Sequence, residues 1–206
     1  MERKIINDWR QVSLRQFMEM AAMQNEEPNA EKFTEKVVGY LYGIDPMQIP
    51  YTEYLAMIAG LNNFFGKSIA EQKVSRNCEY IINGTKYVLD ITPSNFTTAQ
   101  YMDFTTFAKD GQRYVDMLST VLIPDGHKYN DGYDMERTKE DVASMPVADA
   151  MGIINFFANW SKRYIATTLR FLTSRRVTKR MSKEQRRALK EKAKALSRLM
   201  ASFPLS

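Results

Sequence analysis

The sequence predicts a mainly α-helical protein with one β-hairpin and a C-terminal basic amphipathic helix. Three observations lead to this fold class. Apolar residues recur at helical spacing behind capping residues along most of the chain. An Asn83-Gly84 dipeptide separates two strand-like stretches at about residues 76–91. Residues 173–206 carry eleven Lys and Arg against two acids, a net charge of +9, while residues 1–172 carry 18 basic and 22 acidic side chains, a net charge of −4.

This charge asymmetry divides the chain into a helical domain over residues 1–172 and a basic helical tail over residues 173–206. The length of 206 residues suits one domain with an appended element. One cysteine rules out a disulfide within the chain. The N-terminus lacks the apolar region of a signal peptide, and charges interrupt the most apolar stretch, so we expect neither a leader nor a membrane span.

The first third of the chain predicts three helices. A short strand is expected before them, at residues 5–6. The Ser13–Gln16 capping box predicts a helix through about residue 24. A second helix follows and ends at Gly43, because glycine favours the left-handed conformation of a C-terminal cap. The third helix is expected at residues 52–64.

The β-hairpin is the clearest local structure in the sequence. Asn83-Gly84 favours a two-residue type I′ turn, because both turn positions need positive φ. That turn sets the register of the two strands. It pairs Ile82 with Thr85, Tyr80 with Tyr87, and Cys78 with Leu89. These six side chains share a mostly apolar face, so the hairpin is expected to cover helices or to join another strand.

The second half of the chain predicts helices separated by one loop. The expected elements are a helix from Thr97 or Thr98, a helix over residues 114–122, a loop at residues 124–134 and a long helix at residues 147–173. Ser144 is expected to cap the long helix, with Pro146 at its first position.

The residues that most enzymes use are scarce. His127 is the only histidine and Cys78 the only cysteine, too few ligands for a zinc site within the chain. Residues 125–134 are rich in oxygen ligands but lack the bidentate glutamate of a calcium loop at the required spacing. No nucleotide-binding or nucleophile motif occurs. We therefore assign no catalytic, cofactor or metal residue, and we expect a non-enzymatic protein.

The basic tail is the strongest functional signal. Ser182 and Gln185 form a second capping box, and the apolar stripe behind it runs Leu189, Ala193, Leu196, Met200, Phe203. The stripe could pack on the protein's own body, or it could dock on a partner whose acidic rim matches the basic faces. For the second interpretation the predicted partner-binding residues are Arg186, Arg187, Leu189, Lys190, Lys194, Leu196, Met200 and Phe203.

Nucleic acid is the alternative partner for the tail. Lys and Arg would then neutralise phosphates without reading sequence. No aromatic residue is interleaved with the basic run, which favours a protein partner over nucleic acid. The thin stripe lacks Trp, so a membrane surface is a weaker candidate than a protein or nucleic-acid partner.

Three segments together resemble a known class of proteins. They are residues 8–17 (DWRQVSLRQF), residues 39–44 (GYLYGI), and residues 122–126 (LIPDG) running into 129–134 (YNDGYD). This layout is similar to morphogenesis proteins of tailed bacteriophages, in particular tail-assembly chaperone-like proteins of crAss-like and related Bacteroidetes phages. The resemblance covers residues 1–172 and carries no catalytic residue.

The resemblance implies a mostly helical assembly protein, a tail-assembly chaperone or tail-completion factor. Its implied partner is a phage structural protein, such as the tape-measure protein or a tail or portal component. The implied location is the host cytoplasm during assembly. The alternatives left open are a nucleic-acid-binding protein, a virion component near the portal that uses the basic tail, and a homo-oligomer.

Overall fold

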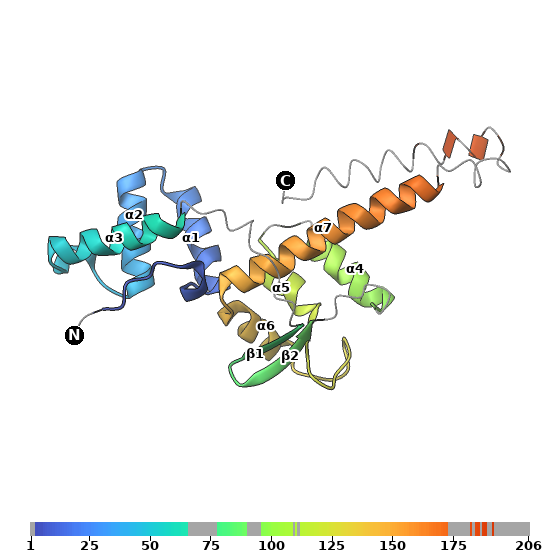
Figure 1. Ribbon diagram of the computed structural model, residues 1–206, viewed down its shortest axis with the longest axis horizontal. Coiled ribbons are helices and arrows are strands. Elements are labelled where there is room, and N and C mark those ends of the chain that lie inside the picture. The colour runs from blue at the N-terminus through green and yellow to red at the C-terminus, as the bar shows by residue number, and fades with distance from the viewer. Residues whose placement is uncertain are drawn as a thin grey trace.

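The prediction of a mainly α-helical fold is confirmed. A computed structural model describes residues 3–65, 78–89, 96–108, 110, 112–172, 182, 184–185, 187–188 and 191. Seven α-helices, two short 3-10 helices and one three-stranded antiparallel sheet lie in this part of the chain (Figure 1). In order they are η1 (Trp9–Gln11), α1 (Leu14–Glu26), α2 (Ala30–Tyr42), η2 (Pro46–Gln48), α3 (Tyr51–Phe65), β1 (Glu79–Ile82), β2 (Thr85–Leu89), α4 (Thr98–Phe107), α5 (Tyr114–Ser119), β3 (Leu122–Pro124), α6 (Met135–Ser144) and α7 (Val147–Leu172).

The predicted caps at the start of α1 and at the end of α2 are confirmed. The Ser13 hydroxyl accepts a hydrogen bond from the Gln16 N–H at 3.1 Å, and the Gln16 side chain accepts one from the Ser13 N–H at 2.9 Å. Gly43 ends α2 with φ 62°. The strand expected at residues 5–6 is absent. Ile6 instead donates its N–H to the Tyr42 hydroxyl at 2.9 Å, so a side chain replaces the strand partner.

The predicted register of the hairpin is confirmed. Ile82 pairs with Thr85 and Tyr80 with Tyr87. The expectation that this face covers helices or joins another strand is also confirmed, because β2 pairs with β3. The helix expected over residues 114–122 is therefore too long. It ends at Ser119, and Leu122 is buried in a strand, where pairing with β2 satisfies its backbone.

The junction between α6 and α7 differs from the sequence-based expectation. Ser144 is the last residue of α6, and its hydroxyl donates to the Asp141 carbonyl at 2.7 Å, so it does not cap α7. Pro146 precedes α7 and forms an isolated antiparallel bridge with Ser13. Two backbone hydrogen bonds hold the bridge, Leu14 N–H to Met145 O at 2.9 Å and Val147 N–H to Val12 O at 2.8 Å. The N-termini of α1 and α7 are thereby joined.

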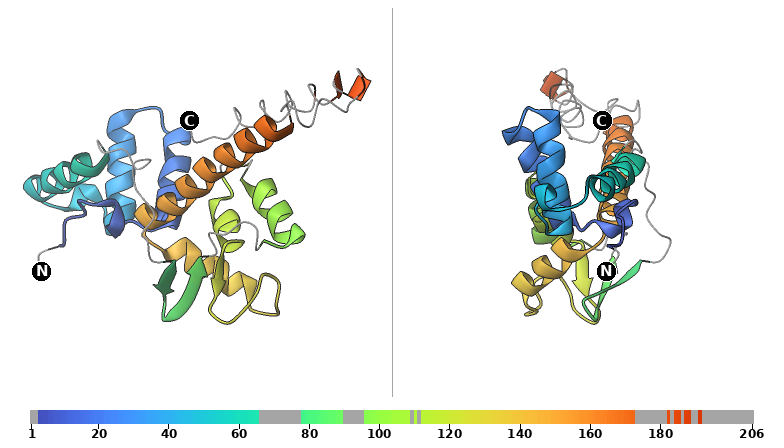
Figure 2. Two further views of the ribbon diagram at one scale, coloured as in Figure 1. Left: turned by 45° about the vertical axis from the view of Figure 1, so that its right-hand side comes forward. Right: turned by 90° about the vertical axis from the view of Figure 1, so that its left-hand side faces the viewer.

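The first half of α7 lies at the centre of the core. Its residues between Val147 and Ala158 are mostly buried and contact η1, α1 and α5. Helices α1–α3 lie on one side of this segment, while α4–α6 and the sheet lie on the other (Figures 1 and 2). The second half of α7 projects away from α1–α3 (Figure 1). None of the described helices combines the length and hydropathy needed to cross a bilayer.

Candidate functional site

An open groove lies where the C-terminal end of α1 meets α2 and η2. Its volume is about 590 Å³. Both apolar and acidic side chains line it, and the turn between α2 and η2 forms one wall. The lining residues are Met23, Glu26, Glu35, Lys36, Gly39, Tyr40, Ile44, Asp45, Pro46 and Met47.

The turn at residues 43–46 shapes this groove through local backbone chemistry. Gly43 adopts the left-handed conformation that stops α2 and reverses the chain. The Asp45 carboxylate then accepts the Met47 N–H at 3.0 Å and so begins η2. A Cβ atom on Gly39 would lie 3.1 Å from the Ile44 carbonyl oxygen, so glycine at this position lets the turn lie close against α2.

Exposed apolar side chains continue from the groove onto α3. Met47 is 82% exposed and Tyr51 is 72% exposed, while Leu55 is 44% exposed. Tyr51 and Leu55 are four residues apart and therefore share one face of α3. Large apolar side chains that stay exposed next to a groove are typical of protein-binding surfaces. We call the groove together with Tyr51 and Leu55 the α2–α3 surface.

The α2–α3 surface belongs to the acidic part of the molecule. Residues 14–65 hold three basic and seven acidic side chains, a net charge of −4. Residues 66–172 hold 12 basic and 13 acidic side chains, a net charge of −1. The acidic excess of the body is therefore concentrated in helices α1–α3.

Within the groove, the one lysine is already paired. Lys36 contacts Glu27 at 3.3 Å, and this hydrogen-bonded pair lowers the pKa of the Glu27 carboxyl. Neither Glu26 nor Glu35 forms an ion pair in the described part of the chain. The groove therefore offers acidic groups to a basic ligand.

Tyr40 adds an uncharged polar group to the groove wall. Burial raises the pKa of its hydroxyl to about 12, and a hydrogen bond to Glu19 acts in the same direction. The hydroxyl therefore stays protonated at neutral pH.

A second polar group, centred on Asp141 in α6, is buried and satisfied. Its carboxylate accepts the Tyr87 hydroxyl at 2.6 Å and the Asn83 amide at 2.8 Å, which ties the hairpin to α6. Burial is the main cause that raises the pKa of Tyr87 to about 12, and the hydrogen bond to Asp141 acts in the same direction. Because both carboxylate oxygens already have donors, this network serves the fold.

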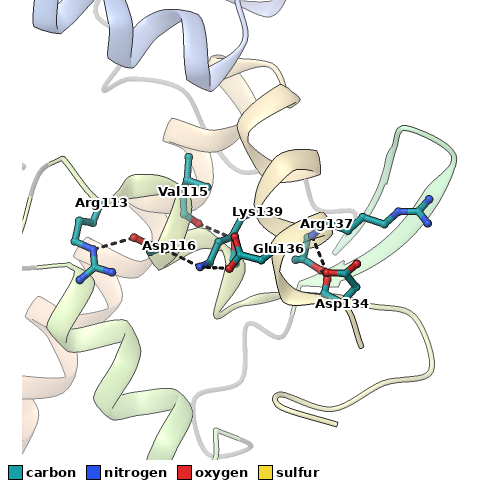
Figure 3. Close-up of polar contacts among 9 residues, drawn as sticks. Arg113, Val115, Asp116, Asp134, Glu136, Arg137 and Lys139 are labelled. Atoms are coloured by element: carbon teal, nitrogen blue, oxygen red, sulfur yellow. Dashed lines mark hydrogen bonds and ion pairs between the residues drawn. The ribbon is translucent and has the colours of Figure 1, made fainter. Parts of the chain in front are cut away.

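A cluster of ion pairs joins α5 to α6 at the surface. The Asp116 carboxylate pairs with Arg113 Nε at 2.8 Å and with Lys139 Nζ at 3.5 Å. Figure 3 shows the two cations on opposite sides of this carboxylate. Lys139 also contacts Glu136 at 2.8 Å. These groups are partly exposed, and such pairs each contribute only about 0–1 kcal/mol. The cluster contains no nucleophile and no histidine.

His127 and Cys78, the side chains that could act as a base or a nucleophile, do not line the groove. His127 is exposed in the loop after β3, with its ring edge-on to Tyr133 at 5.8 Å between centroids. Cys78 is half-buried just before β1. No group of three or more His, Cys, Asp or Glu side chains in the described ranges is arranged to hold a metal ion.

Of the eight predicted partner-binding residues, Arg187 is the one that falls in the described part of the chain. It is helical and exposed. Arg186, Leu189, Lys190, Lys194, Leu196, Met200 and Phe203 lie outside the described residues. The predicted capping box of the tail is confirmed, since the Ser182 N–H donates to Gln185 at 2.9 Å and the Gln185 N–H donates to Ser182 at 3.2 Å.

The segments that resemble phage proteins have structural roles here. Trp9 is buried, and Phe17 contacts its ring edge-on at 5.8 Å between centroids. Gly43 ends α2, and the Tyr129 hydroxyl donates to Asp103 at 2.7 Å. Comparison of the chain with protein-family models, curated proteins and solved structures finds no match.

Sequence reasoning missed the groove. The sequence predicts the end of the second helix at Gly43 and the helices on either side of it. Their packing brings Met23, Tyr40 and Met47 to one site, and such packing leaves no local signature. One feature of the sequence could have indicated an exposed apolar site: Met47 is a large apolar residue in the short segment between Pro46 and Pro50.

Proposed function

We propose that this chain is a non-enzymatic protein-binding factor of phage assembly, a tail-assembly chaperone or tail-completion factor. The observation that carries the binding part of the proposal is the α2–α3 surface. It combines an open groove of about 590 Å³ with exposed Met47 and Tyr51. The phage setting rests on the resemblance of residues 8–17, 39–44 and 122–134 to morphogenesis proteins.

The groove suits a helical segment of another protein. Amphipathic helices lay an apolar stripe into such grooves, with anchors three or four residues apart. The acidic residues beside it, Glu26 and Glu35, favour a segment with basic flanks. A tape-measure protein or another tail component would supply this segment.

The basic tail supplies a second contact in this proposal. Leu189, Leu196, Met200 and Phe203 dock on the partner, while Arg186, Arg187, Lys190 and Lys194 meet its acidic surface. Changing the four apolar residues to Ser should release this contact and leave residues 1–172 folded.

Affinity capture from phage-producing cells, with nuclease treatment in parallel, tests the proposal. Met47→Ser is compared with Met102→Ser, because Met102 is also exposed, at 58%, but lies on α4. We expect the native chain and Met102→Ser to retain a phage structural protein after nuclease, and Met47→Ser to retain about tenfold less, as fits the loss of one buried Met side chain. Equal retention by both variants would contradict a role for the groove.

Nucleic-acid binding is the second candidate, because the tail carries a net charge of +9. About five phosphate contacts predict a slope of roughly −4.5 for log K against log salt on duplex DNA. A protein contact dominated by apolar burial predicts a much shallower slope. Captured material that disappears with nuclease would favour this second candidate.

A further inference from the structure

The groove has two chemically different ends. Helices α1 and α2 lie side by side and are joined by the short turn at residues 27–29 (Figure 2). Glu26 is the last residue of α1 and Glu35 lies in the second turn of α2, so both acids are near this turn. Residues 44–47, which follow the end of α2, line the opposite end with Ile, Pro and Met side chains. The groove therefore runs from an acidic end to an apolar end.

The carboxylates at the acidic end are available to a cation from outside. In the described ranges Lys36 pairs with Glu27 at 3.3 Å, whereas Glu26 and Glu35 form no ion pair. Glu35 is half-buried, so salt and water screen its charge less than that of an exposed group. Burial raises the pKa of the Tyr54 hydroxyl on α3, and the charge of Glu35 acts in the same direction. The negative field of this carboxylate thus extends to its neighbours.

At the apolar end, the one acid is already used by the fold. The Asp45 carboxylate accepts the Met47 N–H at 3.0 Å and the Gln48 side-chain amide at 2.9 Å. The Met47 side chain, by contrast, is 82% exposed. Methionine is flexible and adapts its shape to an apolar contact. A ligand therefore meets a thioether at this end and carboxylates at the other.

The distance between the two ends defines the spacing that a ligand needs. Gly43, at the end of α2, comes eight positions after Glu35, which is about 12 Å along the helix. Residues seven or eight positions apart in a ligand helix lie on one face at about this distance.

We propose that the α2–α3 surface recognises a helix that presents an apolar anchor and a Lys or Arg on one face, seven or eight residues apart. Met47 contacts the anchor, while Glu26 and Glu35 pair with the cation. This inference rests on the proposed function, because it treats the groove as the binding site for a partner. It adds the sequence pattern by which that partner is selected.

The charge of the surroundings favours a basic helix over other occupants. Residues 14–65 have a net charge of −4, so they repel the phosphates of nucleic acids and of anionic lipids. The same charge opposes a contact between the α2–α3 surfaces of two copies. A basic amphipathic helix complements both the acidic end and the apolar end.

Two isomeric peptides test the spacing on the purified full chain. Each is a fluorescent helix of about 22 residues built on Ala and Gln, with two Leu four residues apart at its centre and one Lys on either side. In the same-face peptide each Lys is seven residues from the nearer Leu. In the opposite-face peptide it is five residues away, about 140° around the helix. The symmetric design fits either chain direction, and without acids the peptides offer nothing to the basic tail.

We expect the same-face peptide to bind about fivefold more tightly at low ionic strength, as fits one ion pair at the upper end of the range for exposed pairs. The difference should shrink at about 0.5 M salt, because salt screens the pair. Fluorescence anisotropy measures both affinities. Equal affinities at low salt, or no binding of either peptide at about 1 mM, would overturn the proposal.

A glutamate variant assigns the acidic end. Glu26→Gln/Glu35→Gln should abolish the preference for the same-face peptide, because no carboxylate remains to pair with its Lys. The control Asp131→Asn/Glu140→Gln makes an equal change of charge at exposed positions outside the groove and should keep the preference. A preference that survives the loss of both glutamates would show that another group reads the cation and would refute the assignment.

A methionine variant assigns the apolar end. Met47→Ser should weaken the binding of both peptides about tenfold and keep their ratio, because both carry the same Leu anchor. Met102→Ser, at an exposed position on α4, should change neither affinity. Unchanged binding by Met47→Ser would contradict the role of this side chain.

The peptide assay separates this inference from the proposed function. It contains no phage protein, so equal affinities would refute the spacing rule and leave partner capture to its own test. Conversely, a same-face preference combined with no captured phage protein would support the ligand class and refute the assembly role.

Discussion

Asn83 serves the fold through both its backbone and its side chain. Its φ of 49° fits the hairpin turn, which the sequence predicts. Its amide also donates to Asp141 at 2.8 Å and to Ser144 at 3.0 Å, which no local pattern indicates. The turn residue thereby links the sheet to α6. Asp141, 5% exposed, accepts from both Asn83 and Tyr87, so the link depends on this one carboxylate.

Replacing Asp141 with Ala should destabilise the protein by about 3 kcal/mol. The change leaves the buried Tyr87 hydroxyl and the Asn83 amide without their acceptor, and each unsatisfied group costs about 1–3 kcal/mol. Urea denaturation measures the free energy of unfolding. Asp131→Ala, at an exposed loop position, is the matched control and should change it little. Equal midpoints for the two variants would show that the network contributes no stability.

Alkaline pH should destabilise the protein through its buried tyrosines. Burial raises the pKa of Tyr40, Tyr80 and Tyr87 to about 12, from an ordinary value of 10. The folded state therefore holds these protons more tightly than the unfolded state. Its stability is complete below pH 10 and falls as the pH rises from 10 to 12.

Titration of phenolate absorbance, together with urea denaturation across this range, checks the prediction. Tyr87→Phe should remove one late-ionising group and flatten the pH dependence of unfolding. Unfolding free energies that stay constant from pH 10 to 12 would contradict it.

At the scale of elements, close packing decides how α3 meets the N-terminal segment. A Cβ atom on Gly60 would lie 2.5 Å from Ile5 Cγ2 and 2.6 Å from the Ile6 carbonyl oxygen. The backbone of residues 5–6 therefore lies directly on α3. This contact and the hydrogen bond from the Ile6 N–H to the Tyr42 hydroxyl hold residues 5–6 in place, although they form no strand.

Gly60→Ala should destabilise the protein by about 1–3 kcal/mol. Alanine normally stabilises a helix interior by about 1 kcal/mol relative to glycine, so the expected sign is reversed by the clash. Hydrogen exchange at the Ile6 amide should also become faster. The control Ala56→Gly, on the exposed face of α3, should cost about 1 kcal/mol without changing exchange at Ile6. A stabilised Gly60→Ala protein would mean that residues 5–6 do not pack there.

For the whole molecule, we expect the buried core and the basic tail to be separate parts. The buried apolar residues of the described ranges extend from Trp9 to Ala158. The net charge of residues 1–172 is −4, whereas that of the tail is +9. The stability of the body therefore should not depend on residues 173–206.

A chain truncated after Leu172 should stay folded, with a free energy of unfolding within about 2 kcal/mol of the full chain, because no described core residue is removed. Circular dichroism and urea denaturation check this. A truncated chain that unfolds without a cooperative transition would show that the tail completes the core, and the division at residue 172 would then be wrong.

The sequence by itself determined the features that depend on neighbouring residues. The Ser13 and Ser182 caps, the left-handed Gly43 and the hairpin register all follow from interactions within a few positions along the chain. The charge asymmetry also follows from sequence alone, because it is a sum over residues. The candidate binding residues of the tail belong to this group as a pattern, although seven of the eight lie outside the described residues.

Only the tertiary structure decided which distant segments meet. Residues 122–124 become a strand because β2 lies beside them, and Ser144 ends α6 because its hydroxyl bonds to Asp141. The groove exists because α1, α2 and η2 leave Met47 uncovered. These outcomes depend on burial and on contacts between residues far apart in sequence, such as Tyr87 and Asp141. Local propensity and hydrophobic spacing contain no information about such pairs, because many distant partners satisfy the same local pattern.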